Sequence, residues 1–219
     1  DQGRDIRLQE EVSQQSGINI IVCTGTWLDV PRFFERLKPD KIAGMYIREI
    51  EEGIDGTGIK PGIIKVASDR DGVKPGEELV LRAAARASLR TGTPIMTHTW
   101  APARIGDQQV AILEDEEMDL TKVCIGHSND TTNMQYLTGL LKKGVWLGMD
   151  RHPGGGPDVP DWKERTRTIK ALIDEGWGKR IMVAHDWDSS MGLFPSEMRA
   201  TRESYNPDNY LFIIRNVIP

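Results

Sequence analysis

The sequence predicts an α/β fold built on a parallel β-sheet, and three patterns in the chain support this. Short apolar runs rich in Val and Ile alternate with longer segments that have helical spacing of apolar residues. Six such alternations fit within the 219 residues. Glycine follows most of the helical segments, as at Gly53 and Gly92, which is a typical helix stop. Strands that alternate with helices form either an open doubly wound sheet or a (β/α) barrel.

Each predicted strand is a run of mostly apolar residues, which is typical of parallel strands covered on both faces. In chain order, the six strands are expected at residues 18–24, 62–67, 94–98, 123–127, 145–149 and 181–185. No G-x-G-x-x-G motif follows the first strand, so a dinucleotide-binding fold has little support.

Helices are expected at residues 6–15, 39–52, 76–91, 108–117, 132–143 and 163–175. The third is rich in Ala, Leu, Glu and Arg, and it ends at Gly92 with Pro94 just beyond. The Gly and Pro content of residues 152–162 predicts an irregular loop, and a loop of this length is more often functional than a simple connector. Because no linker interrupts the pattern, we predict a single domain over residues 1–219.

The composition excludes several classes of partner. A net charge of −5 and a pI near 5.5 give no basic surface for nucleic acid. No apolar run approaches the roughly 20 residues of a membrane helix. Cys23 and Cys124 lie in apolar runs, as buried thiols in a reducing compartment do, and a cytoplasmic location is therefore expected.

Ionisable side chains lie at or near the carboxyl ends of five successive predicted strands. They are Lys65, His98, His127, Asp150 with Arg151, and His185 with Asp186. In a (β/α) barrel these strand ends meet on one face, where active sites are built. We therefore expect these side chains to form one site.

Each of these residues also has a structural interpretation. A single histidine at a strand end commonly makes a structural hydrogen bond, and Asp186 could cap the following helix. Chance does not readily place Lys65, His98, His127 and Asp186 at matching points of four strands. Two imidazoles and carboxylate oxygens suit zinc or a similar divalent ion, so we predict these four residues as metal ligands.

Lys65 needs a chemical change to serve as a ligand, because a protonated amine has no free lone pair. Carboxylated by carbon dioxide, it becomes an anionic carbamate that can bridge two metals about 3.5–4 Å apart. The alternative is a Schiff-base lyase that uses Lys65 as its nucleophile. Such an enzyme has no need of two histidines and an aspartate at neighbouring strand ends, so the metal site is preferred.

Five segments resemble, in order and spacing, the metal-binding strands of the phosphotriesterase family of the amidohydrolase superfamily, which includes lactonases. They are GIIKVAS, PIMTHT, VCIGHSNDT, LGMDRHPG and IMVAHDW. The segments VCTGTW and LVLRAAARASLRTG extend the similarity, which runs along the whole chain. The resemblance implies a (β/α)8 TIM barrel of the metal-dependent hydrolase type, with about six of the eight βα units present and the first two strands missing.

The resemblance also implies roles for individual residues. Lys65 matches the carboxylated lysine that bridges two metals, and His98 and His127 match the ligands of the more exposed metal. Asp186 matches the ligand of the buried metal that accepts a proton from the bridging hydroxide. Asp130, in HSNDT, matches an acidic residue on the proton-relay path away from the site.

Two residues are expected to bind substrate. Trp27 falls where the family places an aromatic side chain in the substrate pocket, although it could simply pack at the barrel rim. Arg151 follows Asp150 where phosphotriesterases place histidine and lactonase-type relatives place arginine. It could bind a polar ester group or pair structurally with an acidic neighbour.

The chain departs from the family pattern, because the paired His-x-His of the first strand is absent. No two of the four histidines, His98, His127, His152 and His185, have that spacing. His185 before Asp186 resembles the lactonases, whereas HSNDT and the helix before residues 94–98 resemble the phosphotriesterases.

The predicted function is hydrolysis of a phosphotriester, lactone or carboxylic ester by a hydroxide that bridges two divalent metals. Zinc is the first choice of metal, with cobalt, manganese and iron as alternatives. The competing functions are the Schiff-base lyase and a non-catalytic fragment of the hydrolase. The expected partner is a small ester, without nucleic acid or membrane, and a homodimer is left open. As a fragment with two open apolar sheet edges, the chain is expected to be poorly soluble, to bind at most one metal weakly through His98, His127 and Lys65, and to hydrolyse little.

Overall fold

A computed structural model describes residues 4–187 and 196–218 of the chain. It contains a parallel sheet of six strands whose spatial order, β1-β2-β3-β4-β5-β6, is also their order in the sequence. The strands are β1 (Cys23–Thr26), β2 (Ile63–Ala67), β3 (Ile95–His98), β4 (Val123–Ile125), β5 (Trp146–Met149) and β6 (Ile181–Val183). Six consecutive βα units in this order form part of the wall of a (β/α)8 barrel.

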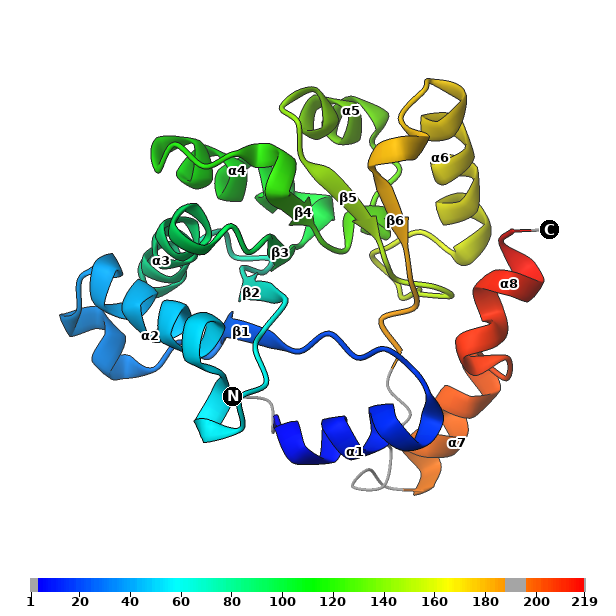
Figure 1. The fold of residues 1–219 in the computed structure, drawn as a ribbon. Helices are drawn as coiled ribbons and strands as arrows, with labels where there is room; N and C mark the ends of the chain where they lie inside the picture. The colour runs from blue at the N-terminus through cyan, green and yellow to red at the C-terminus, as the bar shows by residue number, and fades with distance from the viewer. Residues whose placement is uncertain (1–3, 188–195, 219) are drawn as a thin grey trace.

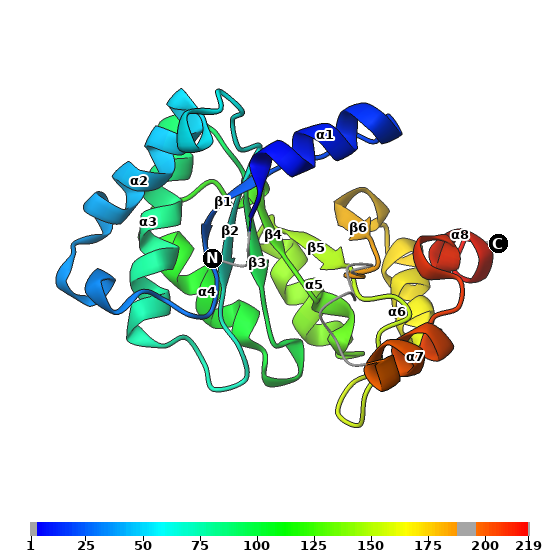
Figure 2. The ribbon, with the colours of Figure 1, turned by 90° about the horizontal axis from the view of Figure 1, so that it is seen from below.

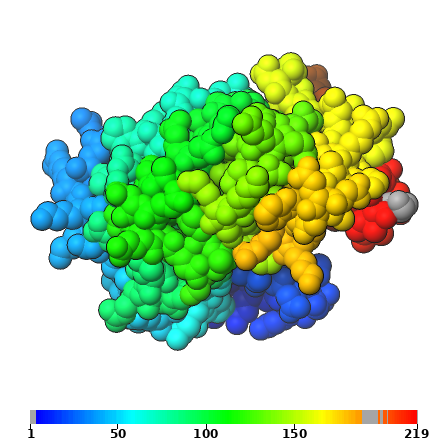
Figure 3. All heavy atoms as spheres, turned by 90° about the horizontal axis from the view of Figure 1, so that it is seen from above, coloured from blue at the N-terminus to red at the C-terminus, as the bar shows by residue number. Residues whose placement is uncertain are grey.

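The helices are α1 (Ile6–Ser16), α2 (Pro39–Glu52), α3 (Pro75–Thr91), α4 (Ile105–Asp115), α5 (Met134–Lys142), α6 (Trp162–Asp174), α7 (Ser196–Tyr205) and α8 (Phe212–Asn216). Helices α2 to α6 follow the outer side of the curved sheet (Figure 1). Seen from above, the surface over the strands is formed largely by these helices (Figure 3). None of the described helices is long and apolar enough to cross a bilayer.

The main core lies between the sheet and these outer helices. Ile64, Ile95 and Leu147 face it from three strands, and each is fully buried. Helix α3 contributes a run of small buried side chains, including Ala83 and Ala84, which allow α2 and the sheet to approach it closely. Burial of this apolar surface is the main force that holds the helices on the sheet.

The sheet has two edges, because β1 and β6 do not pair with each other in the part of the chain that the structure describes. Both edges face the side where α1 lies (Figures 1 and 2). Ile21, just before β1, is 74% exposed, and Met182 in β6 is 44% exposed. The two edges expected from the sequence are therefore present, and both carry exposed apolar side chains.

All six predicted strands and six predicted helices are found, but the strands expected at 123–127 and 181–185 end earlier, at Ile125 and Val183, so His127 and His185 lie beyond them. The first strand begins at Cys23 rather than at residue 18, because pairing with β2 starts where Cys23 meets Ile63. Of the apolar residues before it, Val22 accepts a backbone hydrogen bond from Gly62, but residues 18–22 are not part of the strand, so hydrophobicity alone misplaced its start. The prediction that each strand is covered by other residues on both faces is wrong for β6, because Met182 and Val183 are exposed. Helices α7 and α8 were not predicted.

Candidate active site at the strand ends

A pocket of about 760 Å³ lies along the whole of β1 and reaches Lys65 in β2 and His98 at the carboxyl end of β3. It is lined by all four expected metal ligands and both expected substrate-binding residues: Lys65, His98, His127, Asp186, Trp27 and Arg151. Asp130 lies outside this lining. The sheet thus brings together side chains that are far apart in the sequence.

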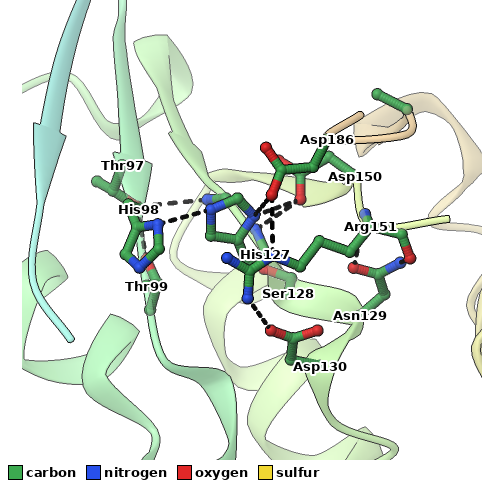
Figure 4. Close-up of polar contacts among 12 residues, drawn as sticks. Thr97, His98, Thr99, His127, Ser128, Asn129, Asp130, Asp150, Arg151 and Asp186 are labelled. Atoms are coloured by element: carbon green, nitrogen blue, oxygen red, sulfur yellow. Dashed lines mark hydrogen bonds and ion pairs between the residues drawn. The ribbon is translucent and has the colours of Figure 1, made fainter. Parts of the chain in front are cut away.

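The two histidines are in direct contact at the centre of the site. His98 Nδ1 lies 2.8 Å from His127 Nε2, and the two rings meet edge to face (Figure 4). His127 Nδ1 lies 2.9 Å from Asp150 Oδ1, which also accepts the backbone N–H of His127. Because the carboxylate accepts, Nδ1 of His127 carries a proton. A carboxylate behind a histidine in this way is typical of metal-binding histidines.

A buried polar network fixes the backbone on which these histidines sit. Gln109 of α4 donates to the carbonyl of His98 and accepts from Thr99. Thr99 in turn bonds Thr97, whose hydroxyl accepts the backbone N–H of Gly126. At Gly126 a Cβ would lie 2.1 Å from the carbonyl oxygen of Thr97, so only glycine fits before His127.

The electrostatics of the site favour neutral nitrogen ligands. Burial, together with His127, Arg151 and Lys65, lowers the pKa of His98 to about 3, so its imidazole is neutral at pH 7. Burial also lowers the pKa of Lys65, despite opposing effects of Asp150 and Asp186. The Lys65 Nζ donates to the carbonyl of Thr97 at 3.1 Å. A lysine with a lowered pKa has more of the neutral amine that reacts with carbon dioxide or with a carbonyl carbon.

Asp186 lies three residues beyond β6, with its side chain 49% exposed. Its Oδ2 accepts from Arg151 Nε at 3.0 Å and lies 3.9 Å from His127 Nδ1. Burial opposes ionisation, but His127, Arg151 and Lys65 outweigh it and hold the pKa of Asp186 below its usual value. A helix cap at Asp186 would involve residues that lie outside the described ranges.

The donor set fits a divalent metal. Within residues 4–187 and 196–218, no three His, Cys, Asp or Glu side chains converge as a metal cluster. The imidazoles of His98 and His127 meet in one pocket with an amine and an ionised carboxylate. The third ligand beside His98 and His127 would therefore come from Lys65, for which carboxylation is the chemical route.

Arg151 pairs with two acidic residues, as its structural interpretation expected, and it also faces the pocket. Its Nε donates to Asp186, and its Nη1 lies 2.5 Å from Asp130 Oδ2 (Figure 4). The other oxygen of Asp130 accepts from Arg165 Nη1 at 2.7 Å. Sequence analysis did not identify Arg165, although its spacing to Ile169 and Leu172 places it on the buried stripe of α6.

The remaining candidates have clear positions. Trp27 lines the pocket and meets the ring of His98 edge to face, at 5.4 Å between centroids. His185 lies outside the pocket lining, and its Nε2 accepts the backbone N–H of Ile213 in α8. His152 is fully buried behind the site, where it contacts Asn129 and the carbonyl of Ala184.

The sequence of this chain is similar to those of several known proteins. The model of the phosphotriesterase family matches residues 1–219. A phosphotriesterase homology protein of Mycobacterium tuberculosis is 38% identical over 227 residues, which cover 99% of this chain and 68% of that protein. An aryldialkylphosphatase of Saccharolobus solfataricus is 40% identical over 187 residues, covering 84% of this chain and 59% of that protein. A human N-acetyltaurine hydrolase is 28% identical over 227 residues, covering 99% of this chain and 62% of that protein.

Proposed function

Because this chain belongs to the phosphotriesterase family, we propose that it is a metal-dependent hydrolase of phosphotriester or lactone and carboxylic ester bonds. The observation that carries the proposal is the meeting of Lys65, His98, His127 and Asp186 in one pocket. The printed names of two relatives, aryldialkylphosphatase and N-acetyltaurine hydrolase, also support a hydrolase of the phosphotriesterase type.

In this proposal, His98, His127 and carboxylated Lys65 would hold one divalent metal, and Lys65 and Asp186 would contribute to a second. Zinc is the first choice, because imidazole and carboxylate ligands suit it, with cobalt, manganese or iron as alternatives. Such metals polarise a phosphoryl or carbonyl oxygen and lower the pKa of water. In this proposal the ligands come from β2, β3 and the segments after β4 and β6, whose side chains line the pocket.

In this proposal, the residues of the pocket have different roles in the reaction. Asp186 accepts the proton of the attacking water, because its carboxylate stays ionised and opens to the pocket. Arg151 holds that carboxylate with its Nε and presents positive charge to a polar oxygen of the substrate. Trp27, Phe34 and Ile21 give the pocket an apolar wall for the acyl chain or leaving group.

The proposal is tested by metal content and hydrolysis measured on the same preparation. We expect metal in the parent protein and in Lys60→Ala, which changes an exposed lysine just before β2. In Lys65→Ala, metal and hydrolysis should be lost together, and short-chain carboxylic acids should restore part of both by replacing the carbamate. Full metal content and unchanged turnover in Lys65→Ala would contradict the proposal.

The Schiff-base alternative has its own readout. Borohydride in the presence of a carbonyl substrate should leave the mass of the protein unchanged if Lys65 is a metal ligand. A stable adduct on Lys65 would instead support the lyase.

A further inference from the structure

Arg165 of α6 is a fully buried charged side chain, with 0% of its surface exposed. Arginine is almost never buried without partners, so its contacts carry information. Its Nη1 donates to Asp130 Oδ1 at 2.7 Å and to the carbonyl of Arg151 at 3.1 Å. Its Nε donates to the carbonyl of Pro160 at 2.8 Å.

These partners stand at both ends of the Gly-rich loop between β5 and α6. Arg151 precedes the loop, and Pro160 lies near its end. Gly154, inside the loop, has a φ of +57°, and a Cβ there would lie 2.5 Å from Arg165 Cζ. The loop is therefore folded closely around the Arg165 guanidinium, which holds both of its ends.

A chain of ion pairs leads from Arg165 to the pocket. Asp130, 1% exposed, accepts from Arg165 on one oxygen and from Arg151 on the other. Arg151 then reaches Asp186 through its Nε at 3.0 Å (Figure 4). Along this series of ion pairs, side-chain exposure rises from 0% at Arg165 to 25% at Arg151 and 49% at Asp186.

We propose that Arg165 is a positioning residue that, through Asp130, fixes the Arg151 guanidinium at the pocket wall and closes the loop beside it. Both oxygens of Asp130 accept from guanidinium groups, which do not give up a proton in proteins. Asp130 therefore anchors Arg151 in this chain. This inference rests on the proposed hydrolase function for its kinetic consequences, whereas its structural consequence can be measured without substrate.

The first test replaces Arg165 by Met, with Arg167→Met as the matched control. Arg167 lies two residues further along the same helix and is exposed. With the better of an acyl lactone and paraoxon, kcat/KM should fall by about 10- to 100-fold in Arg165→Met, since small misplacements of binding groups cost this much. The Arg167 variant should stay within about twofold, the usual result for a surface change.

The second test asks whether Arg165 acts through Arg151. In an Arg151→Met background, adding Arg165→Met should lower kcat/KM by less than about threefold, because coupled residues do not contribute additively. If the two effects instead multiply, Arg165 acts independently of Arg151 and the proposal is overturned.

The third test reads the structure directly by hydrogen exchange of the metal-free protein. Arg165→Met should speed exchange of backbone amides in residues 152–161, while β2 to β4 keep their protection. Unchanged exchange in the loop would overturn the proposal. Because this readout needs neither metal nor turnover, an inactive parent protein would contradict the proposed function and leave this test decisive.

Loss of Arg165 leaves Asp130 with one fewer partner in the interior, so Arg165→Met can fail to fold. Arg165→Lys then serves, because it keeps the positive charge but lacks the fork that reaches two backbone carbonyls. We expect a folded variant with an unprotected loop and lowered kcat/KM. A lysine variant with full loop protection and activity would overturn the proposal.

Discussion

Asp186 is half exposed, yet three neighbouring groups keep its carboxylate ionised. A group in this position can serve the reaction without being needed for folding, because half of its side chain is exposed. The sequence identified Asp186 from its place after a strand. It did not reveal that Arg151, 35 residues earlier in the chain, aligns it.

We predict that Asp186→Asn keeps the fold but lowers kcat by about 10²-fold or more, the usual scale for loss of a general base. Because the pKa of Asp186 is lowered, its carboxylate is ionised above that pKa and the acidic limb of the pH–rate profile reflects its protonation. Thermal unfolding and a pH–rate profile measure the two effects, with the exposed Asp174→Asn as control. An acidic limb that survives in Asp186→Asn would argue against this role.

The charge of Arg151 at the pocket wall favours esters with a polar head. We therefore expect a higher kcat/KM for an acyl lactone than for paraoxon, with paraoxon hydrolysis as a secondary activity. Side-by-side kinetics on one preparation decide the matter, with Lys163→Met as a surface-charge control. A hundredfold preference for paraoxon would reverse this assignment.

At the scale of single elements, features that depend on residues close together in the sequence were predicted correctly. Helix α2 was predicted to the residue, because Pro39 opens it and Gly53 closes it. Lys65 and His98 were placed on neighbouring strands, and the register that pairs Ala67 with His98 brings them to one end of the sheet. These features depend on short stretches of chain, which a sequence shows directly.

Other features depend on partners that are distant in the sequence. Arg165 seemed an ordinary charged residue of α6, because its partner Asp130 lies 35 positions away. The start of β1 was set by pairing with β2, not by its own apolar run. Helix α8 is short, with only Phe212 and Ile213 buried, so it offers too little periodic pattern to predict.

Helices α3 and α4 are joined by an ion-pair network centred on Glu116, which is 11% exposed and accepts from Arg82 and Arg86. Arg86 foremost holds the pKa of Glu116 below its usual value. A lowered carboxyl pKa stabilises the fold above the unfolded-state pKa, and this contribution is lost as pH falls through the folded-state pKa.

We predict that Glu116→Gln lowers the free energy of unfolding by about 1 kcal/mol at pH 7. The difference in unfolding free energy between the variant and the parent protein should shrink at pH 3. At that pH the Glu116 carboxyl of the parent begins to protonate and loses its charge. Urea unfolding at both pH values measures this, with the exposed neighbour Glu117→Gln as control. An equal loss at both pH values would exclude the electrostatic explanation.

For the molecule as a whole, the open edges of the sheet are the surfaces at which association with another chain is expected. Unpaired strand edges with apolar side chains bind other strand edges, and a lysine on the edge opposes this. Ile21 and Met182 mark the two edges.

We predict that the 219-residue chain self-associates as its concentration rises. Ile21→Lys with Met182→Lys should shift it toward the monomer, whereas Leu89→Lys, which changes an exposed residue of α3, should not. Sedimentation velocity over a range of concentrations distinguishes these outcomes. A parent chain that stays monomeric throughout would show that the edges are inert.

The match between strand order and chain order has a consequence for biosynthesis. A ribosome releases the chain from its amino end, and each strand from β2 onward can pair with the strand released just before it. After β1, no strand of this sheet has to wait for a later one before it finds its first neighbour. The nascent sheet can therefore grow one βα unit at a time at the edge away from β1, while the edge at β1 stays unpaired.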